Sequence, residues 1–598
     1  MIEPAARPRR RLTLSHWIVI GLALLAFGLS AVLSNSVFER LPHLEDEVAY
    51  LFQARTLAGG HLVIDSPEPS RAYWQPFVVD YEGTRFGKYS LGWPAHLAIG
   101  VLLGEAWIVN AAFAALSVAM VFRLGAEVFN KETGVVAAAL VACSPAAILL
   151  NATLMGHTTA QFWAIVFVYA FWRIERGRRP IRWGLVAGLA LGLCLINRPA
   201  TGAAFALPFA AYALVKLARL GWRTLRHHEP ARPLGRLAAA LAALSIVTIL
   251  LGMAIPVYNA AATGEPTRNL YRFVWDYDRI GFGEGYGRSG HTLEKGVRHM
   301  RFDLSLTAAD WFGWQWPPVI NAAGDVRPDL ANHFLTEGDY YPALGLSWLL
   351  LPFGLIVVYR WRSAYVLLWL ALGLLWLGWP LIGDGDLSRD PRVAWIVVAG
   401  LGIWLCAPLV VLRDRLQTWT WLLVAIILSL LVIQLTYWIG SQRYSTRYYF
   451  EGLFAAALIS ALPIVWLAQR TRKSLVYGLF AAVLLVSLVI NTLPRVSVLT
   501  GFNLMDRRLI EAVEARREPG REVLVIVTGE DVRWRSYGEL MVVTSPYLDS
   551  PIVAARSSTS LPRASILERF PDRQVIDMVA QENEAWFADE PPPVLPPQ

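Results

Sequence analysis

The sequence carries little charge for its length. Only 17% of its 598 residues are charged, and 55% belong to the apolar set, whereas soluble proteins average about 25% charged residues. The mean hydropathy is +0.43. A water-soluble core stops growing near about 250–300 residues, so this apolar excess excludes an ordinary soluble protein. The remaining apolar side chains need lipid around them, and the sequence predicts a polytopic membrane protein.

Cysteine is also scarce. The three cysteines, Cys143, Cys194 and Cys406, all lie in apolar runs, which excludes a disulfide framework and a thiolate metal site. No HExxH spacing occurs among the histidines, so the sequence indicates neither a metal nor another cofactor, and a divalent ion stays an open alternative.

Lysine is the rarer of the two basic residues. Only five positions hold it, namely Lys88, Lys131, Lys216, Lys295 and Lys473, and the net charge of +8 comes mostly from arginine. The arginines cluster between apolar runs, where they orient a membrane protein. Nucleic acid is therefore not a predicted partner.

Apolar runs of about 20 residues, the length that crosses a bilayer, recur along the chain. About thirteen spans are predicted, near residues 17–34, 106–123, 133–150, 159–175, 182–197, 200–218, 237–261, 343–359, 364–383, 393–412, 418–440, 450–468 and 474–493. The basic clusters fall on one side only if the run 91–103 lies along the membrane surface. This predicts a multi-pass plasma (inner) membrane protein with a cytoplasmic N-terminus. A cleaved signal peptide is the alternative for the first span, but the many later spans favour an uncleaved anchor.

Polar stretches divide the chain further. We expect a membrane domain over 1–494, with outer loops at 35–105 and 262–342. Long loops are usually functional or disordered, and the aromatic residues of the first loop argue against disorder. Residues 495–598 are interpreted as a small extracytoplasmic α/β domain with a strand at 523–527. The predicted fold is an all-α membrane protein with surface helices in its first outer loop and an α/β tail.

The first outer loop contains adjacent acidic residues. Residues 44–58 have the spacing of an amphipathic helix in which Asp46 and Tyr50 share a face, with Glu47 at its edge. A carboxylate in a partly dehydrated cleft gains basicity, so Asp46 and Glu47 are candidates for a general base. The alternative is that both carboxylates only stabilise the first turn of the helix by interacting with the positive end of its dipole.

The order of an apolar span, DEVAYLFQAR, GKYSLGW and a long series of spans resembles the C-type (GT-C) membrane glycosyltransferases. More closely, it is similar to bacterial protein O-mannosyltransferases and lipid A aminoarabinose transferases, within the dolichyl-phosphate-mannose-protein mannosyltransferase-like group. The resemblance implies that Asp46 and Glu47 are the catalytic acidic pair and that Tyr50 is the aromatic residue after it. It implies that Lys88 contacts the phosphate of a polyprenyl-phosphate donor. The family often has prolines just after this lysine, whereas here Pro94 comes six residues later.

The resemblance extends to later positions. Arg198, in Asn-Arg-Pro, matches an Arg-Pro element, and YSTRYY over 444–449 resembles an Arg-Tyr element that includes Tyr448. Arg443 and Arg447 would then lie at the outer surface, where a lipid phosphate is a suitable partner. Ordinary headgroup contact is the alternative for both arginines.

Two further residues complete the predicted set. Tyr89 follows the lysine and is assigned a substrate-binding or supporting role. His157 stands where related enzymes commonly place a second acidic residue, with no carboxylate nearby in the sequence. It could bind donor phosphate or orient the acceptor, or it could only cap a helix.

Together these features predict an inverting transferase that moves a sugar from a polyprenyl-phosphate carrier to an acceptor on the outer face. Asp46 would be the base, Glu47 would support or share that role, and Lys88 with Arg447 would stabilise the leaving phosphate. The expected partners are the lipid-linked donor, membrane lipid and a protein, lipid or polysaccharide acceptor. Two alternatives stay open: a lipid-linked glycan transporter or flippase, and a non-catalytic lipid-binding assembly protein.

Overall fold

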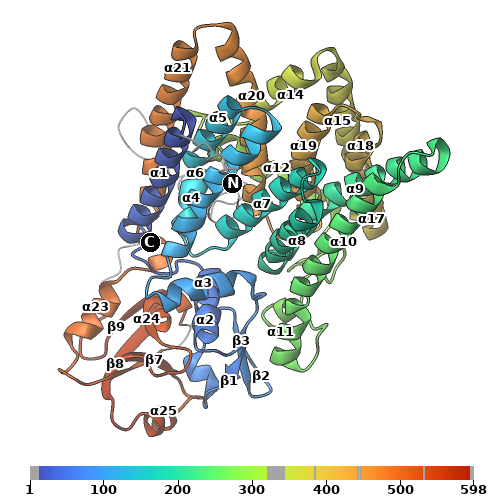
Figure 1. The fold of residues 1–598 in the computed structure, drawn as a ribbon. Helices are drawn as coiled ribbons and strands as arrows, with labels where there is room; N and C mark the ends of the chain where they lie inside the picture. Colours follow the sequence, from blue (N-terminus) through green and yellow to red (C-terminus); the bar gives the residue numbers. More distant parts are fainter. Residues whose placement is uncertain are drawn as a thin grey trace, which may run out of the picture.

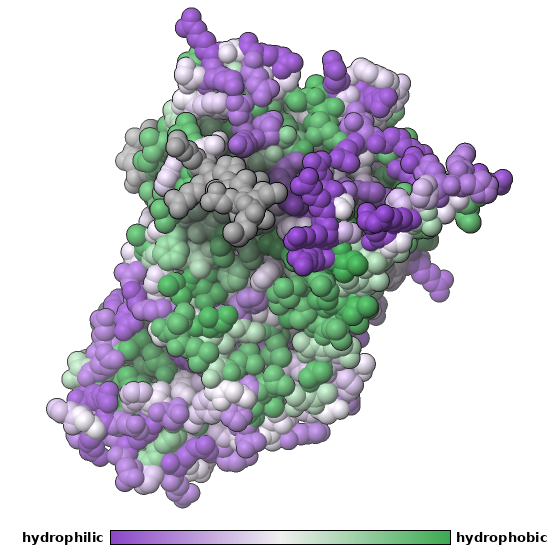
Figure 2. All heavy atoms as spheres, in the orientation of Figure 1, coloured by the Kyte–Doolittle hydropathy of each residue, from purple (hydrophilic) through white to green (hydrophobic). Residues whose placement is uncertain are grey.

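The computed structural model describes residues 12–318, 344–382, 386–440, 444, 447–529 and 532–592. A large bundle of helices adjoins a smaller region of strands and short helices (Figure 1). Figure 2 shows a broad apolar band across the bundle, between two hydrophilic ends. An apolar belt of this kind is what a protein surrounded by lipid exposes.

The bundle is built from helices throughout the first five hundred residues. Its first half contains α1 (Leu14–Ser36), α4 (Ile108–Val128), α5 (Lys131–Ala142), α6 (Pro145–Asn151), α7 (His157–Glu175), α8 (Pro180–Asn197), α9 (Pro199–His227), α10 (Arg232–Gly252) and α11 (Ala254–Thr263). Its second half contains α12 (Leu293–Asp310), the short strands β4 (Gln315–Trp316) and β5 (Leu344–Gly345), α14 (Leu350–Tyr359), α15 (Ser363–Gly378), α16 (Asp386–Arg389), α17 (Pro391–Cys406), α18 (Pro408–Val411), α19 (Arg415–Gln434), α20 (Leu453–Arg470), α21 (Lys473–Val486) and α22 (Leu493–Ser497). Proline stands in the first turn of α6, α8, α9 and α17, where its missing N–H costs no helical hydrogen bond.

Ten helices in the described part are long and apolar enough to cross a membrane, or eleven if α5 and α6 form one bent span. These two helices meet at 60°, where Ser144 caps α6 and Pro145 begins it. The expectation of about thirteen spans is not confirmed. The helix α7, predicted as a span, is not among the ten. Residues 350–381 count as one candidate span, although α14 ends inside this range at Arg360, which has φ 55° and ψ −128°.

The long loop after α1 forms a small layer beneath the bundle. It contains α2 (Glu45–Ala58), β1 (Ile64–Asp65), the 3₁₀ turn η1 (Ser70–Tyr73), β2 (Val78–Tyr81), β3 (Thr84–Gly87) and α3 (Gly92–Leu102). The strand β3 pairs antiparallel with β1 and with β2, so that Val79 faces Phe86 across the second pair. With 11 residues, α3 is too short to cross a bilayer, as expected for the run 91–103.

The C-terminal region contains a four-stranded mixed sheet and three short helices. These elements are α23 (Arg508–Ala515), β6 (Val523–Thr528), α24 (Gly538–Val543), β7 (Ile552–Ser557), α25 (Arg563–Arg569), β8 (Gln574–Gln581) and β9 (Glu584–Phe587). The strand order is β7-β6-β8-β9, with β6 parallel to β7 and β8, and β9 antiparallel to β8. The strand predicted at 523–527 is confirmed as β6, and the expected division at 494/495 falls inside α22.

The C-terminal region adjoins the first loop (Figure 1), with α24 beside α2 and β7 beside η1. Tyr73 packs into one apolar cluster with buried residues of β6 and β7. Gln75 donates its amide to the carbonyl of Met541 over 3.0 Å. The prediction that α2 is a surface helix is therefore wrong, because its apolar residues Val48 and Leu51 are buried in protein, at 3% and 6% exposure.

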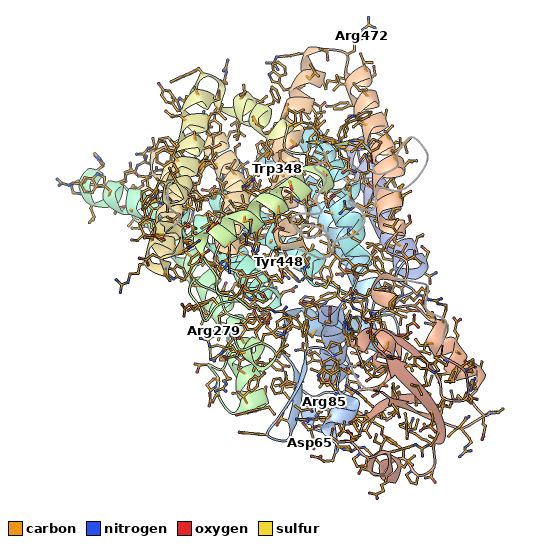
Figure 3. The ribbon with its side chains drawn as sticks, turned by 180° about the vertical axis from the view of Figure 1, so that it is seen from behind. Asp65, Arg85, Arg279, Trp348, Tyr448 and Arg472 are labelled. Atoms are coloured by element: carbon orange, nitrogen blue, oxygen red, sulfur yellow. The ribbon has the colours of Figure 1, made fainter. Side chains whose placement is uncertain are left out.

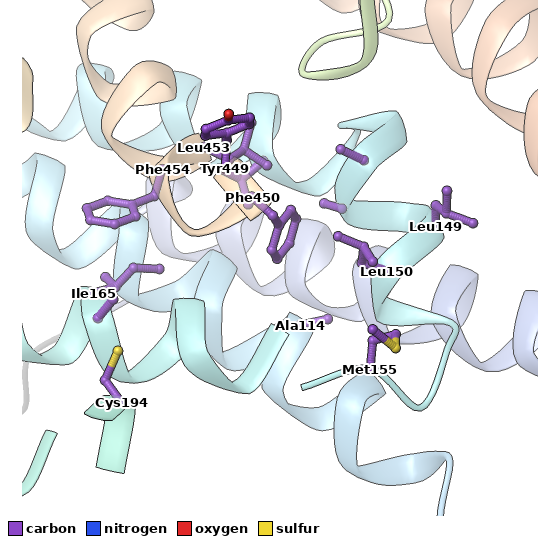
Figure 4. Packing of buried hydrophobic residues seen from close by; sticks show 14 of the residues in the cluster. Ala114, Leu149, Leu150, Met155, Ile165, Cys194, Tyr449, Phe450, Leu453 and Phe454 are labelled. Atoms are coloured by element: carbon purple, nitrogen blue, oxygen red, sulfur yellow. The ribbon is translucent and has the colours of Figure 1, made fainter. Parts of the chain in front are cut away.

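The apolar core of the bundle lies next to this layer. Figure 4 shows Leu150 and Met155, near the break between α6 and α7, close to Phe450 of the 3₁₀ turn η5 (Arg447–Gly452). Phe454, at the start of α20, continues this packing. Polar groups that enter this core have apolar neighbours and need partners from the protein itself.

Glu539 in α24 gives the C-terminal region a pH-dependent stability. Burial raises the pKa of Glu539 to about 8, and the charge on Asp506 adds to this effect. The folded state therefore favours the protonated acid, and its stabilisation is lost as the pH rises toward 8. We predict that the apparent melting temperature of the detergent-solubilised protein falls more steeply between pH 6 and 8 for the wild type than for Glu539→Gln. Parallel curves for the two proteins would contradict this prediction.

Candidate active site

The carboxylate of Glu47 fixes where α2 begins. Its Oε2 accepts hydrogen bonds from the backbone N–H groups of His43 (2.8 Å) and Leu44 (3.0 Å). Its Oε1 accepts one from the N–H of Leu154 (2.7 Å), and Tyr444 donates its hydroxyl to Oε2 over 3.2 Å. Burial raises the pKa of Glu47 to about 7, against the effect of these hydrogen bonds. The carboxylate thus ties the start of α2 to the segment between α6 and α7.

Asp46 takes a different environment from its neighbour. Tyr89 donates its hydroxyl to Asp46 Oδ1 over 2.6 Å, and Arg447 Nη1 lies 3.6 Å from Oδ2. The Asp46 side chain keeps 18% of its surface exposed and lines a cavity, which Glu47 does not. A carboxylate held in one orientation at a cavity wall is placed to accept a proton from a bound hydroxyl.

Lys88 follows β3 directly and lies in an aromatic enclosure. Its Nζ lies 3.7 Å from Asp278 Oδ2, and the lysine side chain is 3% exposed. The distances from Nζ to the nearest ring centroids are 3.7 Å, 4.7 Å, 5.1 Å and 5.2 Å, for Phe77, Trp275, Tyr271 and Tyr89. Burial lowers the pKa of Lys88, and the charge on Asp278 opposes this effect. Ring faces and a carboxylate together stabilise the ammonium away from bulk water.

These side chains line one cavity of about 470 Å³, a volume typical of small-molecule sites. The cavity lies where α2, the start of α9, the segment before α12 and the end of α19 meet. In Figure 3, Tyr448 and Arg279, both in its wall, lie between Asp65 and Arg85 at one end of the molecule and Arg472 at the other. Its aromatic walls include Tyr50, Phe77, Tyr271, Trp275, Tyr437 and Trp438.

Behind the cavity, three polar residues meet in the apolar core. His157 Nδ1 lies 3.2 Å from Glu451 Oε1, and Arg198 Nη1 lies 3.1 Å from His157 Nε2. Arg198 Nε lies 3.0 Å from the same oxygen of Glu451. No carboxylate lies near His157 in the sequence, but η5 supplies one from almost three hundred residues away.

The structure brings most of the predicted site residues together. The cavity is lined by Asp46, Tyr50, Lys88, Tyr89, Arg198, Arg447 and Tyr448, whereas Glu47 and His157 lie behind its wall. Arg447 is 9% exposed and lines the cavity wall. Arg443 lies outside the described residues.

Two acidic residues escaped the sequence reasoning. Asp278 pairs with Lys88, and it also accepts hydrogen bonds from Tyr437 (3.1 Å) and from Trp438 Nε1 (3.0 Å). Glu451 lies in an otherwise apolar span, and an ionisable residue in such a span is itself a signal of function. Among the described residues, no group of three or more His, Cys, Asp or Glu side chains could hold a metal ion.

Residues 95–255 match the sequence profile of a family described as dolichyl-phosphate-mannose-protein mannosyltransferase. The match begins just after Lys88 and takes in α4 to α10. It confirms the resemblance to the C-type membrane glycosyltransferases for the segment that it covers. No curated protein sequence matches the chain.

Two solved structures resemble the chain in part, at low sequence identity. ArnT from Cupriavidus metallidurans bound to undecaprenyl phosphate is 10% identical, with a TM-score of 0.46, over 95% of this chain and 93% of that chain. Archaeal oligosaccharyltransferase AglB from Archaeoglobus fulgidus, in complex with an inhibitory peptide and a dolichol-phosphate, is 13% identical, with a TM-score of 0.41, over 94% of this chain and 69% of that chain.

The hydrogen bonds of Glu47 predict that a substitution at this position lowers the stability of the protein without changing the lining of the cavity. Glu47→Gln would turn an amide N–H₂ toward backbone donors and leave at least one N–H without a partner, which costs about 1–3 kcal/mol. We expect a lower apparent melting temperature in thermal unfolding of the detergent-solubilised protein. Glu45→Gln serves as the control in the same helical turn. A Glu47→Gln protein as stable as the wild type would show that the network does not hold α2.

Proposed function

We propose that the protein is an inverting glycosyltransferase that moves one sugar from a polyprenyl-phosphate carrier to an acceptor at the outer face of the membrane. The observation that carries the proposal is the position of Asp46. Its carboxylate shares one cavity with Lys88, Arg198 and Arg447, and Tyr89 orients it through a 2.6 Å hydrogen bond. The family match over residues 95–255 supports a lipid-phosphate sugar as the donor.

The reaction needs one base and a stabilised leaving group. Asp46 would take the proton from the acceptor hydroxyl as its oxygen attacks the anomeric carbon of the sugar. The bond between that carbon and the phosphate oxygen breaks, and its electron pair leaves with the phosphate. Attack from the face opposite the phosphate inverts the anomeric centre. A phosphate departs as a stable anion, so no acid is needed to protonate it.

The cations of the cavity would stabilise the charge that grows on the leaving phosphate. Lys88 lies 3.7 Å from Asp278, and Arg447 lies 3.6 Å from Asp46, both longer than a direct hydrogen bond. A phosphate could therefore draw either cation toward itself without breaking a short contact. Charge stabilisation in a partly dehydrated site is often the largest contribution to catalysis.

Glu47 takes a positioning role in this proposal. It lies outside the cavity and already accepts four hydrogen bonds. We infer that it holds α2 so that Asp46 faces the acceptor, and that it does not share the base role. The C-terminal region, whose helix α24 packs beside α2, would lie on the same outer face as the acceptor.

The base assignment predicts that Asp46→Asn loses transfer of sugar from a polyprenyl-phosphate donor by at least about 100-fold, because general-base catalysis contributes factors of this size. Transfer is measured with radiolabelled donor and full-length protein. The control is Asp65→Asn, which makes the same change on the exposed strand β1 of the same loop. Its turnover and its melting temperature should both stay at the wild-type level.

The outcome separates the alternatives. Near-normal turnover of Asp46→Asn would remove Asp46 from the mechanism. Wild-type protein that moves the intact lipid-linked sugar between leaflets, without forming a glycosylated product, would favour a flippase.

A further inference from the structure

Arg198 occupies a one-residue break between two membrane helices. It follows the last residue of α8 and precedes Pro199, the first residue of α9, with φ −142° and ψ 92°. The extended backbone at this position ends one helix and lets the next begin in another direction. Because Pro199 fixes the start of α9, the direction of the Arg198 side chain is set by the backbone.

Two fully buried side chains hold the guanidinium from behind. Glu451 and His157 are both 0% exposed, whereas the Arg198 side chain is 17% exposed. The distances among the three groups are 3.0–3.2 Å. Only the arginine therefore reaches the cavity, and the other two act on a ligand through it.

The proton positions in this trio follow from the chemistry of arginine. A guanidinium carries donors only and stays protonated in proteins. His157 Nε2 must therefore accept the N–H of Arg198, which places the imidazole proton on Nδ1. That Nδ1–H points at the Glu451 carboxylate, 3.2 Å away. The result is one directed chain of hydrogen bonds from Arg198 through His157 to Glu451.

The cavity side of Arg198 meets a second arginine over one aromatic ring. The guanidinium carbons of Arg198 and Arg447 lie 5.9 Å and 5.1 Å from the centroid of the Tyr448 ring. Contacts to Glu451 and His157 involve Nε and Nη1, which leaves the Nη2 edge of Arg198 for a ligand. Both guanidinium groups line the cavity, and arginine binds phosphate through paired N–H donors.

We propose that Arg198 and Arg447 clamp the phosphate of the isoprenoid carrier over Tyr448, and that Glu451 and His157 are positioning residues for Arg198. This rests on the proposed function for the identity of the ligand, an isoprenoid phosphate. It assigns to Arg198 a direct contact with the phosphate. It assigns to Glu451, which the sequence did not single out, the role of fixing that contact.

Binding of farnesyl phosphate, a short isoprenoid phosphate, tests the clamp by titration calorimetry on the full-length protein in detergent. Arg198→Lys keeps the positive charge but loses the paired N–H donors of the guanidinium, and Glu451→Gln removes the charge of the buried carboxylate. Each should weaken binding about tenfold, the loss expected when a hydrogen bond to a charged group is weakened. Binding of farnesol, which lacks the phosphate, should not change. Asp310→Asn is the control, since Asp310 is also buried and paired with an arginine, Arg495, away from the cavity.

A double-mutant cycle separates positioning from a general structural effect. In an Arg198→Ala background, Glu451→Gln should cause no further loss of farnesyl phosphate affinity, because Glu451 acts only through Arg198. If Glu451→Gln does not fold, His157→Gln tests the same link. Binding of Arg198→Lys within twofold of wild type, or a full additional loss in the double variant, would overturn the clamp. Wild-type protein that binds farnesyl phosphate but never transfers a sugar would contradict the proposed function and leave the clamp standing.

Discussion

The hydrogen bonds of the Glu47 carboxylate are the interaction on which the site depends. They join the approach to α2, the segment before α7 and Tyr444, three stretches that are distant in the sequence. Because Glu47 is fixed, its neighbour Asp46 has to face the cavity. A rotation of α2 by one residue would place the wrong carboxylate at Tyr89. The acidic pair therefore has two separate tasks, one residue anchoring the helix and the other contacting the ligand.

Charge pairing is the second constraint. Burying an unpaired ion in an apolar surrounding is costly, and removing one partner of a buried pair leaves the other uncompensated. Each of the three inner cations of the cavity accordingly has its own carboxylate: Lys88 with Asp278, Arg447 with Asp46, and Arg198 with Glu451. The pairs differ in length, with the Arg198 pair the shortest. The looser pairs can exchange a carboxylate for a phosphate, while the tighter one keeps its arginine in place.

Sequence reasoning identified the residues that share a local motif. Asp46, Lys88 and Tyr89 lie close together in the chain, next to recognisable elements, and the structure places them in one cavity. The sequence alone could not place Glu451 beside His157, because only the packing of η5 against α7 brings these two residues together. The burial of α2 was also missed, since nothing in residues 44–58 reveals that α24 of the C-terminal region packs against them. The predicted boundary between 343–359 and 364–383 coincides with Arg360, which ends α14, although residues 350–381 count as one candidate span.

The central claim is that the lipid phosphate binds among these cations, beside Asp46. A cryo-electron microscopy structure of the full-length protein with a bound polyprenyl phosphate tests it most directly. We predict the phosphate within hydrogen-bond distance of Arg447, with Asp46 still bonded to Tyr89 and facing the space where the sugar would sit. A phosphate bound elsewhere, with Arg447 still paired to Asp46 and the cavity empty, would show that these cations do not hold the lipid phosphate.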